Sequence, residues 1–253
     1  MKKIGICLAG GGARGIAHIG VLRVLEENNI RPDYVSGASM GAIVGAMYAD
    51  GLSSERMMEA LLETKIYKLF TFGMPWDGLT ELKYLKKMLN KYISAKRFED
   101  LKKKLFVAIS NLNTGQAEIH SIGELHQIVQ ASACIPLIFK PIDIGNYTYV
   151  DGGLLNNLPV EPLLDISEVI IGVNVNGNNI LSKENWNLKT IAERSFDLVM
   201  WTNASHNLKK CHIIIEPSET TKHNLFDFGA AKKIYQYGYD ETKRLMPEIL
   251  KLV

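Results

Sequence analysis

The chain has 253 residues and a mass of 28.2 kDa, a size at which α/β folds commonly form a single domain. Hydrophobic residues make up 47% of it and charged residues 22%, a composition that excludes intrinsic disorder, collagen and coiled coil. The net charge is only +2 and the pI about 8.3, so we expect no nucleic-acid partner. We predict one domain over residues 1–253.

The cysteines and the first residues bear on the cellular compartment. Cys7, Cys134 and Cys211 are odd in number and form no CxxC or Cys-His cluster, so we expect buried reduced thiols and no metal site. Only five largely apolar residues, Ile4–Leu8, follow the N-terminal lysines, fewer than the roughly 7 to 15 of a secretory signal. The longest weakly polar stretch, 37–49, is too short to span a bilayer core of about 30 Å. These observations predict a cytoplasmic protein.

In chain order, the predicted elements alternate between strands and helices. Residues 3–9 form an apolar run ended by glycine, and residues 16–27 then place apolar side chains at helical spacing. A short strand at 33–36 and a helix of small residues at 40–48 repeat that order. The remaining helices are predicted at 53–64, 79–92, 124–134, 188–207 and 228–250, and the remaining strands at 104–111, 116–121, 147–150, 168–175 and 211–216. The alternation indicates an α/β fold with a mainly parallel sheet covered on both faces.

A Gly-x-Ser-x-Gly motif, Gly37-Ala38-Ser39-Met40-Gly41, lies between the second predicted strand and the helix after it. Small residues let the backbone take a strained turn that lifts the Ser39 hydroxyl clear of the sheet, in front of the helix N-terminus. The pattern therefore predicts a nucleophile elbow. A plain glycine-rich turn is the alternative, which the strand before the motif and the helix after it disfavour.

A glycine-rich loop, Gly10-Gly11-Gly12-Ala13-Arg14-Gly15, joins the first predicted strand to the first predicted helix. Successive glycines leave backbone N–H groups uncovered, and such donors at a helix N-terminus suit a phosphate or an oxyanion. The loop also fits the Gly-x-Gly-x-x-Gly of dinucleotide-binding units, but Asp33 begins the second strand instead of following it, and no P-loop lysine is present. We expect an oxyanion loop, with glycines that serve only close helix packing as the alternative.

A serine nucleophile needs a base, which is either a histidine or a carboxylate. His206 and His212 lie downstream of Ser39, although a serine that follows only the second strand fits poorly with α/β-hydrolase topology. Asp151 ends an apolar strand before two glycines, and a carboxylate in that position can act as the base without an imidazole. An Asp-Gly hairpin turn is the alternative for this segment.

Together these motifs resemble those of the patatin-like phospholipase family. The loop at 10–15 matches the family's oxyanion loop, residues 37–41 its nucleophile motif, and Asp151-Gly152-Gly153 its Asp-Gly-Gly/Ala motif. Ala131-Ser132-Ala133-Cys134-Ile135-Pro136 is similar to the Ala-Ser-x-x-x-Pro segment that precedes the catalytic aspartate. The motifs occur in the right order over residues 5–160, and the remainder of the chain fits by its pattern of strands and helices.

The resemblance implies a three-layer α/β/α sandwich and a Ser-Asp dyad in place of a triad. Ser39 would attack an acyl ester while Asp151 takes its proton, with no metal or other cofactor. Backbone N–H groups would hold the tetrahedral oxyanion, where one such donor is typically worth about 3 kcal/mol. The residues implied for this hole are Gly10, Gly11, Gly12, Ala13 and Arg14, and those implied as supports are Gly37, Gly41, Gly152, Gly153 and Pro136.

Two segments bear on how a lipid or other acyl-ester substrate reaches the site. Residues 70–79 are rich in aromatic side chains broken by glycine and proline, which predicts a cap over an acyl pocket within 66–100; a core-packing loop is the alternative. Residues 83–104 hold nine Lys or Arg against two acidic residues. A solvated face is favoured for this run, with peripheral contact to anionic lipid as the alternative.

The resemblance predicts a lipid acyl-ester hydrolase of the phospholipase A, lysophospholipase or esterase type. An acyltransferase that forms the same acyl-Ser39 intermediate is the first competing hypothesis, because related elbows serve transacylases with a histidine base. A lipid-binding or regulatory module that keeps the fold without turnover is the second.

Overall fold

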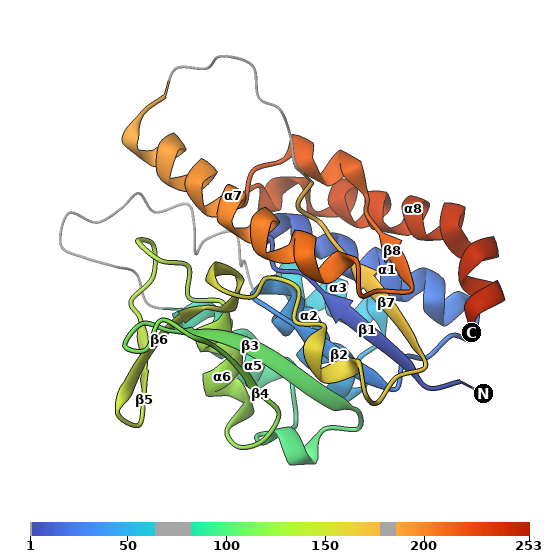
Figure 1. The fold of residues 1–253 in the computed structure, drawn as a ribbon, viewed down its shortest axis with the longest axis horizontal. Coiled ribbons are helices and arrows are strands. Elements are labelled where there is room, and N and C mark those ends of the chain that lie inside the picture. The colour runs from blue at the N-terminus through green and yellow to red at the C-terminus, as the bar shows by residue number, and fades with distance from the viewer. Residues whose placement is uncertain (1, 64–81, 178–185) are drawn as a thin grey trace.

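A computed structural model describes residues 2–63, 82–177 and 186–253 of the chain (Figure 1). The described strands form one eight-stranded sheet in the order β5-β6-β3-β2-β1-β7-β8, with β4 paired to β3. Strands β3, β2, β1, β7 and β8 are parallel, whereas β4, β5 and β6 pair antiparallel at one side of the sheet. The strands are β1 Ile4–Leu8, β2 Tyr34–Gly37, β3 Lys104–Asn111, β4 Ala117–His120, β5 Ile142–Ile144, β6 Tyr147–Asp151, β7 Val169–Val173 and β8 Ile213–Ile215.

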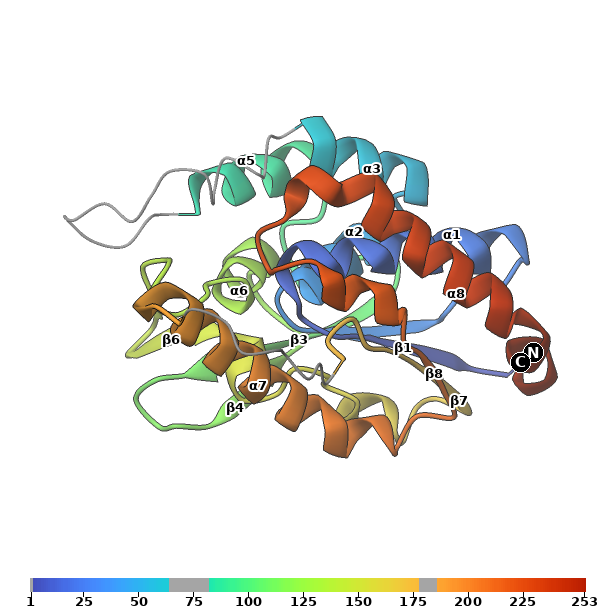
Figure 2. The ribbon, with the colours of Figure 1, turned by 90° about the horizontal axis from the view of Figure 1, so that it is seen from above.

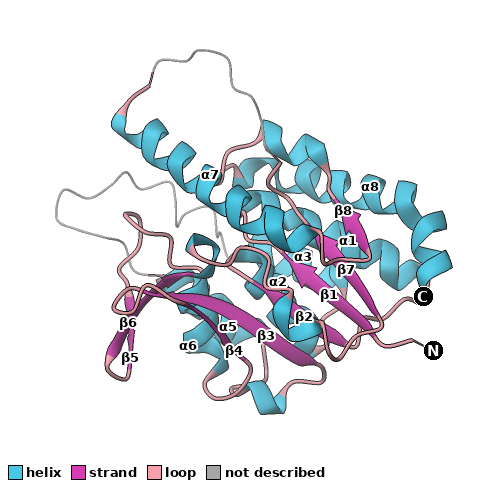
Figure 3. Ribbon diagram, in the orientation of Figure 1, coloured by secondary structure: helices cyan, strands magenta, loops and turns pink. Residues whose placement is uncertain are grey.

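Helices cover both faces of the sheet, as the two views in Figures 2 and 3 show. Helices α1, α2 and α8 lie over one face, and α7 lies over the opposite face (Figure 2). The expected three-layer α/β/α sandwich with a mainly parallel central sheet is thereby confirmed. The helices are α1 Ala17–Glu27, α2 Met40–Asp50, α3 Ser54–Glu63, α5 Lys83–Tyr92, α6 Leu125–Ser132, α7 Leu188–Leu208 and α8 Ala231–Leu252.

Two apolar cores fill the space between the layers. The larger core joins β1, β2 and β3 to α1, α2, α6 and α8; every residue of α2 is buried, and most of them belong to this core. The smaller core lies on the α7 side, where Cys7 and Phe106 of the sheet pack with Leu158 and with Ala204 of α7. A helix that is apolar all round is stable only when it is enclosed, so α2 is a rigid support for the residue that precedes it.

The register of the parallel strands brings two of the predicted motifs together. Leu8, the last residue of β1, lies opposite Gly37, the last residue of β2. The loops that follow both strands therefore emerge side by side at the carboxyl edge of the sheet, which is where open α/β sheets place their ligand sites.

Most predicted elements are confirmed with small shifts at their ends. Strand β5 was not predicted, because three residues are too few to establish a period. The expectation that all three cysteines are buried is wrong for Cys211, which is partly exposed, whereas Cys7 and Cys134 are buried. Residues 66–81 of the predicted cap lie outside the described residues.

Candidate active site

Ser39 occupies the sharp turn between β2 and α2, as the elbow motif predicts. Its backbone has φ 51° and ψ −123°, a region that residues with a side chain rarely adopt. The flanking glycines are required by close packing: a Cβ on Gly41 would lie 2.1 Å from the carbonyl oxygen of Leu8, and one on Gly37 would lie 2.6 Å from the Gly41 backbone. The strained turn is therefore pressed against the end of β1.

A second serine, Ser132, supports the turn through a hydrogen bond to its backbone. The Ser39 N–H donates to Ser132 Oγ at 2.9 Å, and the Ser132 hydroxyl in turn donates to the carbonyl oxygen of Ala108 at 2.7 Å. Ser132 is fully buried at the end of α6, and Pro136 lies in the turn that follows this helix. The Ala-Ser-x-x-x-Pro segment therefore supplies a hydrogen bond to the candidate nucleophile, a role that the motif alone does not reveal.

Asp151 meets Ser39 across 112 positions of sequence. The Ser39 hydroxyl donates to Asp151 Oδ2 at 2.6 Å, and the N–H of Gly153 donates to Asp151 Oδ1 at 2.8 Å. Asp151 ends β6, and Gly152 lets the following turn pass close to β3, because a Cβ there would lie 2.0 Å from the carbonyl oxygen of Ala108. The two predicted site residues thus form one hydrogen-bonded pair.

The environment of Asp151 changes its acidity. The side chain is wholly buried, and this desolvation raises its pKa from the ordinary 3.8 to about 7, against the lowering effect of the hydrogen bonds from Ser39 and Gly153. A carboxyl group with a pKa near neutrality can exchange a proton with a hydroxyl at little cost, which suits it to act as a general base.

The glycine-rich loop lies beside Ser39 and leads into a 3₁₀ turn, Gly12–Ile16, that is continuous with α1. A Cβ on Gly10 would lie 3.0 Å from Ser39 Cβ. The N–H groups of Gly10, Ala13 and Arg14 donate to backbone carbonyls within the protein. Among the residues that the structure describes, those of Gly11 and Gly12 have no acceptor, so these two amides are available to a bound oxyanion.

Arg14 ties the loop to distant parts of the chain. Its guanidinium makes a bidentate ion pair with the carboxylate of Asp197 in α7, with N–O distances of 2.9 and 3.1 Å. Its Nε donates to the carbonyl oxygen of His223 at 2.7 Å. Asn176 bridges the same assembly, because it accepts from Arg14 and donates to the carbonyl oxygen of Gly10. Asp197, His223 and Asn176 have no counterpart in the sequence prediction, since no motif surrounds them.

The histidines considered as alternative bases have other partners. His206 is exposed on α7, where its Nδ1 lies 3.3 Å from the carbonyl oxygen of Thr202. His212 Nδ1 accepts from the N–H of Ile170 at 3.0 Å. Buried His18, whose pKa is lowered to about 4 by desolvation, donates to the carbonyl oxygen of Ala9 immediately before the glycine loop. The partner of the Ser39 hydroxyl is the carboxylate and not an imidazole.

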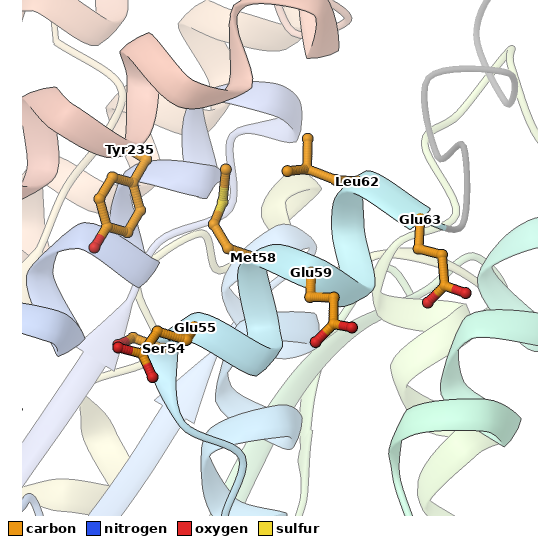
Figure 4. Close-up of a pocket in the computed structure, with 7 residues that line it drawn as sticks. All are labelled: Ser54, Glu55, Met58, Glu59, Leu62, Glu63 and Tyr235. Carbon is orange, nitrogen blue, oxygen red and sulfur yellow. The ribbon is translucent and has the colours of Figure 1, made fainter.

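A separate surface depression of about 640 Å³ lies along α3 and α8 (Figure 4). Its glutamates are already paired with Arg23, Arg56 and Lys91. In the described part of the chain, no group of three or more His, Cys, Asp or Glu side chains is arranged to hold a metal ion. The residues lining the depression are Ser54, Glu55, Met58, Glu59, Leu62, Glu63 and Tyr235, and they include neither Ser39 nor Asp151.

Fold and site define an α/β protein with a serine–aspartate pair at the carboxyl edge of a mainly parallel sheet. Residues 6–164 match the patatin-like phospholipase family, and the chain belongs to that family. The crystal structure of VipD from Legionella pneumophila has a similar fold, with a TM-score of 0.59 and 18% sequence identity over 98% of this chain and 67% of that chain.

Similar curated sequences are much longer proteins. An uncharacterized NTE family protein of Mycobacterium tuberculosis is 34% identical over 160 residues, which are 62% of this chain and 27% of that protein. Lysophospholipase NTE1 of Candida glabrata is 28% identical over 274 aligned positions, 96% of this chain and 16% of that protein. The mouse patatin-like phospholipase domain-containing protein 6 is 29% identical over 63% of this chain and 12% of its own length. The chain thus spans less than a third of each of these relatives.

Among the described residues, no helix is both long enough and apolar enough to cross a membrane.

Proposed function

We propose that this protein is a serine hydrolase of lipid acyl esters, with Ser39 as nucleophile and Asp151 as general base. The observation that carries the proposal is the 2.6 Å hydrogen bond from the Ser39 hydroxyl to a wholly buried carboxylate, within a turn whose backbone is strained. Membership of the patatin-like phospholipase family and the similarity to a lysophospholipase support a lipid ester as substrate.

The first half of the proposed reaction acylates the serine. Ser39 Oγ attacks the ester carbonyl carbon while its proton passes to Asp151 Oδ2. The negative charge that develops on the carbonyl oxygen is stabilised by the N–H groups of Gly11 and Gly12, which have no acceptor among the described residues. The tetrahedral intermediate collapses, the proton moves from Asp151 to the leaving alcohol, and an acyl group remains on Ser39.

The acyltransferase hypothesis shares this first half and differs only in what accepts the acyl group. Its usual histidine base has no counterpart beside Ser39, because His206 and His212 are bonded elsewhere. The hypothesis of a module without turnover is disfavoured by the backbone strain retained at Ser39, since strain persists where it serves a mechanism.

A fluorophosphonate probe tests the proposal directly. The wild-type protein should be labelled and should release p-nitrophenol from p-nitrophenyl butyrate, whereas Ser39→Ala should abolish both. Asp151→Asn should lower the labelling rate by at least about 100-fold, the usual contribution of a general base. His206→Ala is the matched control and should behave as wild type. Equal labelling of wild type and Ser39→Ala would refute the nucleophile.

We also propose that the substrate is reached at a lipid surface, through one uncharged face of α7. The helix adjoins the site, because Asn203 donates to the carbonyl oxygen of Leu154 at 2.7 Å, three residues after Asp151. Ser195 and Thr202 lie on the same exposed face at helical spacing, and among the side chains of α7 that the structure describes, no Lys, Arg, Asp or Glu lies on it. The apolar residues there are Leu188, Ile191, Leu198 and Val199, with exposed fractions of 82%, 49%, 42% and 37%.

A vesicle-binding assay distinguishes membrane contact through this face of α7 from contact through the basic residues at 83–104. Arg97 and Lys91 of that run are exposed and paired with glutamates, in keeping with the favoured solvated face. Binding to phosphatidylcholine vesicles should be weakened by Ile191→Glu and should change little with salt. Leu250→Glu, at an equally exposed position on α8, is the control. Binding only to anionic vesicles, lost at high salt, would instead assign the contact to the basic run.

A further inference from the structure

The side chain of Asn157 is buried and lacks a hydrogen-bond partner in the part of the chain that the structure describes. It is wholly buried, and neither Oδ1 nor Nδ2 finds a partner in the described part of the chain. Asn157 is the one described residue with both polar side-chain atoms in this condition. An unpartnered buried amide destabilises a folded chain, so a native protein that keeps one usually has a use for it.

The unpartnered amide lies close to both Ser39 and Asp151, beside the hydrogen bond that joins them. Its Oδ1 is 2.5 Å from the position that a Cβ of Gly10 would occupy, and Ser39 Cβ is 3.0 Å from that same point. It is also 2.7 Å from the position of a Gly153 Cβ, which lies 3.0 Å from Asp151 Oδ1. Two glycines of the site motifs therefore leave room for an amide that has no hydrogen-bond partner among the described residues.

The backbone holds Asn157 in this place. Its carbonyl oxygen accepts the N–H of Gly10 at 3.2 Å, so the residue is fixed to the start of the oxyanion loop. Its neighbour Asn156 points elsewhere, with its amide bonded to Glu161. Asn157 is thus held by the glycine-rich loop beside Ser39 and by the segment that follows Asp151.

We propose that Asn157 Oδ1 binds the water that hydrolyses the acyl-Ser39 intermediate, and that this residue makes the enzyme a hydrolase in preference to a transferase. The inference rests on the function proposed above. Once Ser39 is acylated, its oxygen no longer donates to Asp151 Oδ2, and that carboxylate oxygen can accept one hydrogen of a water. Asn157 Oδ1 accepts the other hydrogen, which leaves an oxygen lone pair directed at the acyl carbon.

The deacylation step balances with these groups alone. The water oxygen forms a bond to the acyl carbon, and its proton passes to Asp151. The C–O bond to Ser39 then breaks, the proton returns from Asp151 to Ser39 Oγ, and the carboxylic acid leaves. An alcohol has only one hydrogen to donate, and Asp151 accepts it. The alkyl group of the alcohol then faces the amide where water has its second hydrogen, so Asn157 forms no hydrogen bond to an attacking alcohol.

The ratio of transfer to hydrolysis measures this role. With p-nitrophenyl butyrate in the presence of methanol, one acyl-enzyme partitions between butyric acid and methyl butyrate, and the ratio of the products is independent of the acylation rate and of the folded fraction. Asn157→Ala should raise the ester-to-acid ratio about 10-fold, the factor expected for one lost hydrogen bond. Intact-mass spectra should also show butyryl-enzyme accumulating in the variant.

Two further variants keep the test decisive. Asn157→Leu retains the side-chain volume without the polar atoms, and it should give the same shift in ratio with an unchanged or higher melting temperature. Asn156→Ala is the matched control and should partition as wild type. A wild-type ratio in both Asn157 variants would overturn the inference while leaving the hydrolase intact. Absence of any Ser39-dependent product from the wild type would instead overturn the proposed function.

Discussion

Replacing the buried carboxyl group of Asp151 by an amide tests the electrostatics of the site without any substrate. Asp151→Asn keeps the shape of the side chain, an acceptor for the N–H of Gly153 and a hydrogen-bonding partner for Ser39. The ability to ionise is lost, and the amide nitrogen donates to Ser39 Oγ where Oδ2 of the aspartate accepted from it. The variant should therefore be inactive as an esterase and yet more stable than the wild type at alkaline pH.

The size of the effect follows from the pKa of Asp151, which burial raises from 3.8 to about 7 in the folded protein. Between these values the folded state holds one proton more than the unfolded state, so the free energy of unfolding falls by about 1.4 kcal/mol per pH unit. The cost of the buried charge is absent below pH 4 and complete above pH 7, where it reaches about 4 kcal/mol. Asparagine carries no such cost.

The assay is urea unfolding of wild type and Asp151→Asn at pH 5 and pH 8. The stability advantage of the variant should grow by about 3 kcal/mol between the two pH values. His18, with its pKa lowered to about 4, makes both proteins more stable as pH rises from 4 toward 6.5, and this opposite trend cancels in the difference. Asp165→Asn, at an exposed position, is the control. An advantage for Asp151→Asn that does not change with pH would refute a carboxyl group titrating near neutrality.

Three further outcomes test the site. The kcat/KM for ester hydrolysis should rise with pH and level off above about 7, because Asp151 must be ionised to act as base; a profile that is flat from pH 5 to pH 8 would contradict its role. Ser132→Ala leaves the N–H of Ser39 buried without an acceptor and should cost about 1–3 kcal/mol in urea unfolding, with a lower kcat; unchanged stability and kcat would show that the turn needs no support. Asp197→Asn leaves the mostly buried guanidinium of Arg14 without its carboxylate and should cost about 3 kcal/mol and lower kcat more than it changes KM; a change in KM alone would place Asp197 in substrate binding.

The sequence predicted most of the fold, and it singled out Ser39 and Asp151, which the structure joins by a hydrogen bond. Strand and helix periods are local properties, and the glycines at 37, 41 and 152 mark close approaches that tolerate no side chain. In a parallel sheet the carboxyl ends of neighbouring strands lie at the same edge, which places the loops after β1 and β2 side by side. Asp151 is different, because it lies on antiparallel β6, and no local period places that strand's end beside Ser39. Its position at a strand end before two glycines made it one candidate base beside the histidines, and the resemblance to a family then selected it as the partner of Ser39.

Other parts of the site could not be predicted because they depend on long-range packing. Asn176, Asp197 and His223 bind Arg14 or Gly10 from positions 162 to 209 residues away, and none of them lies in a motif. Asn157 follows the Asp-Gly-Gly turn closely, but nothing in a sequence reveals whether a buried amide has a partner. The missing hydrogen bonds of the Asn157 amide are visible only in the three-dimensional structure.

The links from Arg14 to the second half of the chain bear on where a working fragment could be cut. The family match ends at residue 164, yet β7, which completes the pairing of β1, and all the partners of the Arg14 guanidinium lie beyond it. A fragment truncated at that point would still contain Ser39 and Asp151, but it would expose one edge of the central strand and release the glycine loop. The part of the chain that holds the glycine loop and the Ser39–Asp151 pair in place is therefore longer than the stretch that matches the family.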